Sequence, residues 1–308
     1  MPDDFGEDLF RQASIAHEIG HLLWLRLPGF ADEVRAITGF SENQRLLEWD
    51  GQTLRGSLDW PFGAWVHELT SDAVATLMLG PAALHGFIHS FARPDDPERV
   101  LIAGGDARGY REHPPAHLRV HLSAALLTRM GFDQEAKALV EDWDRLHGAP
   151  EFIALATTRG SLVSLPLEQL VEHGRRAEEA LYGTPLACLD GVTLQDFPAF
   201  EMSPGMWARV QRRAADLIAG EDFHADGRTA LAAAIVARAR RPDLAARIER
   251  GLQVAVLGRD AHERHAADPH YQRRRGASAA RQGLAHQVRD ALLLAEILER
   301  PAARRRRA

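Results

Sequence analysis

The chain has 308 residues, of which 45% are hydrophobic and 26% charged, and its formal net charge is −6. This composition supports a packed core, favours about two domains or one domain with an extension, and gives no reason to expect nucleic acid as a partner. Cys188 is the only cysteine, which excludes an intrachain disulfide and an all-cysteine zinc site.

The two ends of the chain bear on its location. The N-terminus lacks the basic segment and apolar stretch of a secretory signal, and no segment reaches the roughly 18 uninterrupted apolar residues that a membrane span needs. We therefore expect a cytoplasmic protein without a membrane span. The basic cluster at residues 304–307 is expected to be a solvated tail, although such a cluster could also touch an anionic surface.

Apolar residues recur at helical spacing through most of the chain, which predicts a mainly α-helical fold with a small β component (α+β). The first helix is expected at residues 7–27, where proline and glycine follow. The pattern then alternates, and the Asp50-Gly51 pair is a hairpin turn signal. Two or three short strands are therefore expected within residues 32–58.

A second helix is expected at residues 63–80, closed by Gly80 and Pro81. A loop rich in glycine, aspartate and proline follows Pro94, and helices dominate the remainder. Those helices are predicted at 116–130, 134–147, 166–182, 204–219, 227–256 with a break at Pro242, and 278–299, with 184–203 irregular. A boundary near Gly131 divides the chain into 1–130 and a helical region, 131–308.

The stretch Ala-His-Glu-Ile-Gly-His at residues 16–21 is the first motif with chemical content. Residues four apart share one face of a helix, so His17 and His21 can present their imidazoles to one ion. Glu18 can then take a proton from a water bound to that ion. Two histidines leave the site incomplete, because catalytic zinc usually has three protein ligands and an open position.

The second helix offers the missing groups. Glu68 and Asp72 are also four residues apart, in an otherwise apolar segment where an acidic side chain needs a partner. One carboxylate can bind zinc while the other accepts the free ring N–H of a ligand histidine. His67 competes as a ligand, but as the neighbour of Glu68 it is expected to point about 100° away.

These motifs, followed by "HPPAHLRV" at residues 113–120, resemble those of the gluzincin zinc peptidases, with their HExxH and ExxxD pattern. The third element is similar to the HPPxxxR element of the group that contains HtpX and the CAAX prenyl-protein endopeptidases. The resemblance covers residues 10–125. It implies a zincin-like active site on two helices with a short β-hairpin and one zinc ion per chain.

Carried over residue by residue, the resemblance implies that His17, His21 and Glu68 bind the metal. Glu18 would be the general base, and His113 would assist catalysis. Asp72 would support His17, and Arg119 would shape the site. The expected function is hydrolysis of peptide bonds in a peptide or protein substrate by a metal-activated water.

Several alternatives stay open at this stage. The chain could be a catalytically inactive, metal-stabilised helical protein that binds a partner or acts as a sensor, and manganese or iron could replace zinc. Only 16 residues precede His17, so the domain is either shortened at its N-terminus or uses the hairpin within 32–58 to align substrate. His85 and His89 could form another metal pair but lack a nearby carboxylate.

Overall fold

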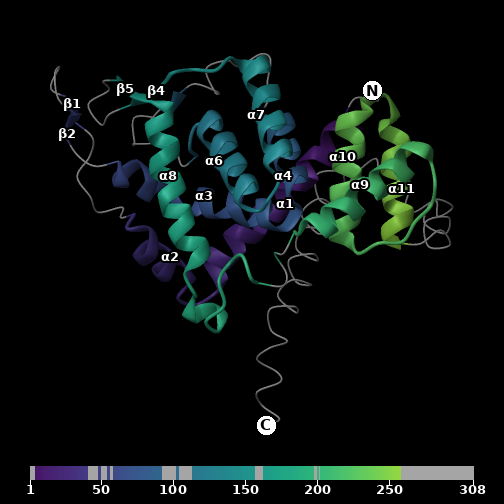
Figure 1. The fold of residues 1–308 in the computed structure, drawn as a ribbon, viewed down its shortest axis with the longest axis horizontal. Coiled ribbons are helices and arrows are strands. Elements are labelled where there is room, and N and C mark those ends of the chain that lie inside the picture. The colour runs from purple at the N-terminus through teal and green to yellow at the C-terminus, as the bar shows by residue number, and fades with distance from the viewer. Residues whose placement is uncertain are drawn as a thin grey trace, which may run out of the picture.

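The computed structural model of the chain describes residues 4–40, 48–49, 54–55, 58–91, 102–103, 113–156, 162–197, 200 and 202–257. The fold is mainly helical, as predicted, with two small sheets (Figure 1). The α-helices are α1 (Asp4–Arg26), α2 (Phe30–Thr38), α3 (Asp59–Leu79), α4 (Pro81–Phe91), α6 (Ala116–Arg129), α7 (Asp133–His147), α8 (Leu167–Gly183), α9 (Pro204–Ala219), α10 (Gly227–Arg240) and α11 (Ala245–Leu257). Two short 3₁₀ helices, η1 (Ala187–Leu189) and η2 (Pro242–Leu244), lie between them.

The strands form two sheets. β1 (Glu48–Trp49) and β2 (Leu54–Arg55) pair antiparallel, with Glu48 opposite Arg55, and so confirm a hairpin within the predicted segment. β4 (Phe152–Ala156) lies between β3 (Ile102–Ala103), to which it is parallel, and β5 (Leu162–Pro166), to which it is antiparallel. This second sheet was not expected from the sequence.

One predicted strand region is a helix. Residues 32–40 show some alternation, but they lie largely in α2, where Phe30 and Val34 are four residues apart and both fully buried. Glycines with positive φ flank α2 at Gly29 (86°) and Gly39 (71°). Burial of one helical face outweighs the weak alternation, so the strand prediction was wrong here. α4 (Pro81–Phe91) was not predicted either, although Gly80 and Pro81 do end α3 as expected. The remaining described helices lie close to their predicted positions, including the break at Pro242.

Some predicted features lie outside the described residues. They are the Asp50-Gly51 turn, the loop after Pro94 as far as residue 112 apart from β3, the helix at 278–299, and the basic cluster at 304–307.

The centre of the fold is the pair formed by α1 and α3, which pack along each other. α3 is buried from residue 65 to its end with the exception of His67, as expected for a helix that is apolar nearly all round. Gly20 makes the close approach possible, because a Cβ at this position would lie 2.4 Å from the Cα of Ser71. This contact sets the spacing of the two helices that carry the candidate ligands.

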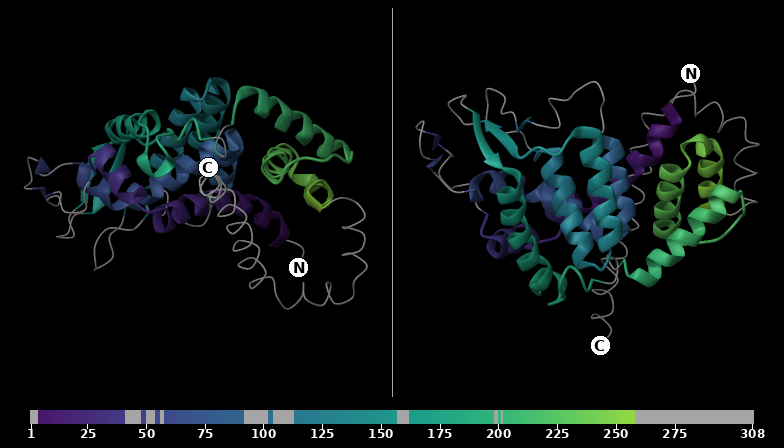
Figure 2. Two further views of the ribbon diagram at one scale, coloured as in Figure 1. Left: turned by 90° about the horizontal axis from the view of Figure 1, so that it is seen from below. Right: turned by 45° about the horizontal axis from the view of Figure 1, so that its top comes forward.

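The remaining helices surround this pair. α9, α10 and α11 form one end of the molecule, and α2, α8 and the small sheets lie toward the other (Figures 1 and 2). α6 packs against α7 and α8, and α10 packs against α1 and α4, so elements from both sides of the predicted boundary at Gly131 are in contact. The division into two domains itself stays a prediction.

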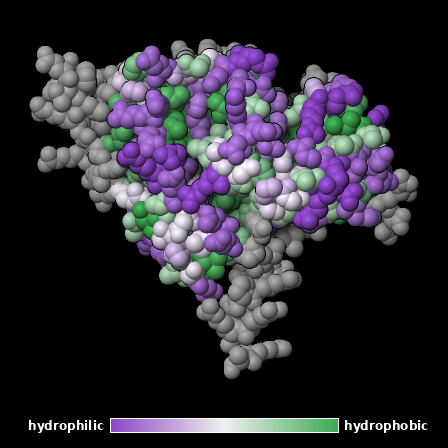
Figure 3. Space-filling model, in the orientation of Figure 1, coloured by the Kyte–Doolittle hydropathy of each residue, from purple (hydrophilic) through white to green (hydrophobic). Residues whose placement is uncertain are grey.

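The described surface is mixed in character. Hydrophilic side chains cover much of the face seen in Figure 3, interrupted by smaller hydrophobic areas. Among the described helices, none combines the length and apolar character needed to cross a bilayer.

Candidate metal centre

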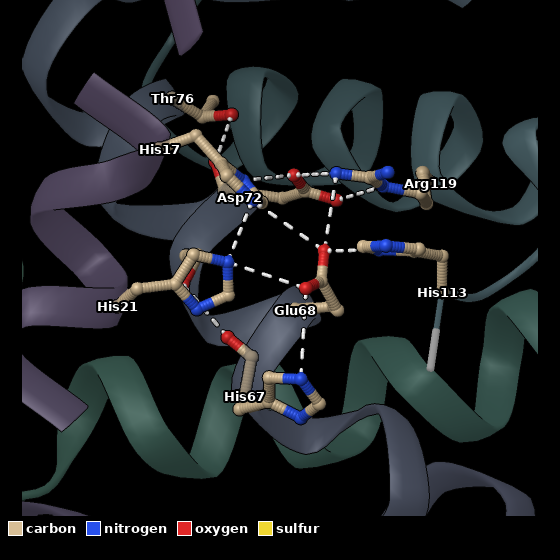
Figure 4. A network of polar contacts seen from close by, with 9 residues as sticks. His17, His21, His67, Glu68, Asp72, Thr76, His113 and Arg119 are labelled. Carbon is tan, nitrogen blue, oxygen red and sulfur yellow. Dashed lines mark hydrogen bonds and ion pairs between the residues drawn. The ribbon is translucent and has the colours of Figure 1, made fainter. Parts of the chain in front are cut away.

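Two helices bring three potential metal ligands together. His17 and His21 come from α1 and Glu68 from α3 (Figure 4). The Nε2 atoms of the two histidines are 3.0 Å apart. Glu68 Oε2 lies 3.4 Å from His17 Nε2, and Glu68 Oε1 lies 3.2 Å from His21 Nε2. The structure thus places the three predicted ligands around one point.

These separations fit a tetrahedral ion. Ligand bonds of about 2.0–2.1 Å to zinc imply neighbouring ligand atoms about 3.3 Å apart. The observed 3.0, 3.2 and 3.4 Å match that spacing. A single ion at the centre can therefore reach all three side chains with little movement of the helices.

The hydrogen bonds behind the histidines fix which ring nitrogen faces the centre. His17 Nδ1 is 2.8 Å from Asp72 Oδ1 and donates its proton to that carboxylate. His21 Nδ1 is 3.2 Å from Ser71 Oγ, whose own proton is donated to the carbonyl of His67 at 2.8 Å. Ser71 is therefore the acceptor for His21. In both neutral rings Nε2 carries a lone pair directed at the centre.

Three electron-rich groups thus converge where a cation is needed. Glu68 is only 3% exposed, and its Oε2 atom is buried without a hydrogen-bond partner among the described residues. His113 Nδ1 lies 2.9 Å from this oxygen, at ion-pair distance but without hydrogen-bond geometry. Converging lone pairs and an unpartnered carboxylate oxygen are what a metal ion neutralises.

The pKa values of the ligands also indicate that a positive charge is favourable at the centre of the site. Burial alone favours the neutral acid, but the neighbouring His113, His17, His21 and Arg119 lower the pKa of Glu68. Burial by itself lowers the pKa of His17, yet its hydrogen bonds to Asp72 and Glu68 outweigh that effect and raise the pKa to about 9. Without a metal, a proton on His17 therefore takes the place of the cation.

Asp72 ties the site to α6. Arg119 donates from Nε to Asp72 Oδ2 and from Nη2 to Asp72 Oδ1, both at 2.6 Å. Burial raises the pKa of Asp72, but the charge and hydrogen bonds of Arg119 dominate and lower it, so Asp72 stays ionised. Arg119 Nη2 also lies 3.7 Å from Glu68 Oε2. Asp72 and Arg119 therefore hold the ligands from behind.

The two predicted catalytic residues occupy different positions. Glu18 is exposed and makes no hydrogen bond or ion pair with any part of the chain that the structure describes. His113, with a side chain 63% exposed, lies beside Glu68 at the open edge of the site. His67 Nε2 comes within 3.5 Å of Glu68 Oε1, closer than its predicted direction implies. It does not join the three-ligand group.

One residue of the site, Ser71, was not predicted from the sequence. Ser71 orients His21, and the signal for it is position: it precedes Asp72, which does the same for His17. Comparison with known families, curated proteins and solved structures gives no match to this chain. The interpretation of the site therefore depends on its geometry and chemistry.

Proposed function

We propose that the protein is a zinc-dependent metallopeptidase whose ion is held by His17, His21 and Glu68. The observation that carries the proposal is the set of three ligand atoms 3.0–3.4 Å apart, with both imidazole lone pairs directed between them. Three protein ligands leave a fourth position for water or substrate, as in catalytic rather than structural zinc sites.

The ion, when bound, would act as a Lewis acid toward the peptide carbonyl and acidify a water molecule. Glu18 takes the proton of the attacking water and delivers it to the leaving amine. Its exposure on the same helix as the histidines leaves it open to solvent and substrate. Asp72 keeps the proton of His17 on Nδ1, so that Nε2 stays a ligand.

His113 has the second catalytic role in this proposal. Its ring is largely exposed and its Nδ1 lies 2.9 Å from a ligand oxygen, so a small rotation brings an N–H toward a substrate carbonyl at the site. A hydrogen bond at that point stabilises the negative charge that develops on the carbonyl oxygen. Arg119 does not face substrate in this scheme, because Asp72 accepts two of its N–H groups.

The test combines metal analysis with a cleavage assay. The purified chain is analysed for bound metal, which also distinguishes zinc from manganese or iron. It is then assayed on a fluorogenic peptide library beside Glu18→Gln and Glu168→Gln, a matched change at an exposed glutamate on α8. We expect Glu18→Gln to retain the metal and lose at least 100-fold in turnover, the scale of one general base. Glu168→Gln should behave like the parent.

The outcomes separate the two candidate functions. Cleavage that Glu18→Gln abolishes supports the peptidase. Bound metal without cleavage of any peptide points to the metal-stabilised, non-enzymatic alternative. Full activity in Glu18→Gln refutes the mechanism, and a chain that holds no metal at these ligands refutes the site.

A further inference from the structure

A second group of potential ligands lies between α6 and α7, which pack side by side (Figure 1). His117 and His121 are four residues apart on α6, and Asp144 comes from α7. One nitrogen or oxygen from each lies within 4.8 Å of those of the other two. None of these residues belongs to the first site, because positions 117 and 121 face away from position 119 on the same helix.

Each residue of this cluster contributes one buried polar atom that has no hydrogen-bond partner among the described residues. His117 is fully buried, and the side chains of His121 and Asp144 are about one quarter exposed, at 24% and 26%. Nevertheless His117 Nε2, His121 Nε2 and Asp144 Oδ1 are all shielded from solvent and lack hydrogen-bond partners among the described residues. The closest approach, His121 Nε2 to Asp144 Oδ1, is 3.6 Å.

A cluster of three residues that each bury such an atom needs an explanation. Each buried polar atom without a partner is unfavourable, and native structures contain few of them. Burial favours the neutral form of both imidazoles, so a proton is a poor solution here, whereas a divalent ion satisfies two imidazoles and a carboxylate together. The His85–His89 pair has the same i,i+4 spacing. Unlike His117 and His121, however, it belongs to no group of three potential ligands among the described residues.

We propose that His117, His121 and Asp144 form a second metal-binding site, specific for a divalent transition metal, that clamps α6 to α7. Asp144 contributes the negative charge, and the two imidazoles contribute nitrogen ligands that such ions accept. His147, one turn beyond Asp144, packs its ring against Trp143 at a centroid distance of 4.1 Å, and its Nε2 is also buried without a partner among the described residues. The surroundings are therefore rich in nitrogen ligands.

Trp143 gives this site its own reporter. Its Nε1–H donates to His117 Nδ1 at 2.8 Å, which places the proton of the neutral ring on Nε2. A metal that binds Nε2 moves the ring proton to Nδ1, so the indole N–H must turn away as the ion enters. Trp143 also precedes Asp144 in the chain, so a quenching ion such as Co²⁺ changes its fluorescence directly.

The experiment counts ions in the full-length chain and in three double variants. Each protein is loaded with Zn²⁺, freed of excess by gel filtration and measured by elemental analysis. We expect two ions in the parent, one in His121→Asn/Asp144→Asn and one in His17→Ala/His21→Ala. The control His85→Asn/His89→Asn should keep two. Because the two sites share no ligand, failure of the first site leaves one ion in the parent and in His17→Ala/His21→Ala, and none in His121→Asn/Asp144→Asn.

A second measurement tests the site even if His121→Asn/Asp144→Asn does not fold. Co²⁺ is titrated into His17→Ala/His21→Ala and into the same protein with Trp143→Phe. Saturable quenching that Trp143→Phe largely removes supports the second site. The proposal is overturned if the His17→Ala/His21→Ala chain binds no metal and shows no quenching, or if a folded His121→Asn/Asp144→Asn chain keeps as many ions as the parent.

Discussion

Asp72→Asn tests whether the polar network behind the ligands stabilises the fold. Asp72 accepts three hydrogen bonds, one from His17 and two from Arg119, and is 3% exposed. An asparagine in this position presents an NH₂ group to one of these donors and leaves Arg119 buried beside a neutral amide. Breaking a buried ion pair from one side destabilises a protein by about 3–5 kcal/mol. We expect a loss of this size in the free energy of unfolding.

Urea unfolding followed by circular dichroism measures the effect, with a chelator present so that metal binding does not contribute. Asp243→Asn is the matched control, because Asp243 also accepts Nε–H and Nη2–H of an arginine, Arg241, but on the exposed surface. Its unfolding curve should hardly move. The double variant Asp72→Leu/Arg119→Met should lose less stability than the sum of its single changes, because neither member of the buried Asp72–Arg119 pair is left without the other.

If Asp72→Asn lowers the free energy of unfolding by less than about 1 kcal/mol, the Asp72–Arg119 ion pair behaves like an exposed one. That result would refute the claim that this buried network stabilises the fold. Zinc affinity provides an independent readout. Removal of a group that orients a ligand histidine typically lowers metal affinity 10- to 100-fold. An unchanged zinc affinity in Asp72→Asn would contradict the role of Asp72 in holding His17.

Three further predictions concern other parts of the fold. Gly20→Ala should destabilise the protein by about 1–3 kcal/mol in urea unfolding and weaken zinc binding, because the new Cβ would lie 2.4 Å from the Cα of Ser71. The control Gly227→Ala, where a Cβ meets nothing within 4 Å, should change neither stability nor zinc binding. Burial and the nearby Glu33 raise the pKa of Cys188 from 9.0 to about 11. Alkylation of this thiol at pH 8 should therefore be about 100-fold slower than that of a free thiol, its rate should rise tenfold per pH unit toward pH 11, and Glu33→Gln should increase the rate. An alkylation rate equal to that of a free thiol would contradict this prediction. Asp226→Ala should lower the free energy of unfolding by about 1 kcal/mol, because the N-cap of α10 is lost. Burial tends to raise the pKa of Asp226 but its hydrogen bonds with Thr229 lower it, so the stability difference between parent and variant should vanish only when acid protonates Asp226 below that pKa. A stability difference that persists in acid would count against the cap.

The sequence was a good guide where one periodic signal dominated. The helices that carry His17, His21, Glu68 and Asp72 are long, α1 amphipathic and α3 apolar nearly all round, so their existence followed from the pattern of apolar residues alone. The i,i+4 rule then placed each pair on one face. That both faces meet at one point could not be derived from spacing, because it depends on how closely α1 and α3 approach at Gly20.

Other features depended on contacts between distant segments. α2 is short, and its helical face is recognisable only once the burial of Phe30 and Val34 is known. β4 pairs with β3 across about 50 residues of chain, and no local pattern indicates such a register. The cluster around His117 was missed for a similar reason: Asp144 joins the two histidines only because α7 folds back along α6.

α6 presents Arg119 to one candidate metal site and His117 with His121 to the other, from opposite sides of a single helix. If both sites bind metal, a displacement of this helix that improves one set of contacts alters the other, and binding at the two sites would be thermodynamically linked. Such linkage is reciprocal: if an ion at one site changes the metal affinity of the other site by some factor, an ion at the other site changes the affinity of the first by the same factor. Ion binding between α6 and α7 would in that way alter the contact of Asp72 with His17 from the opposite side of α6.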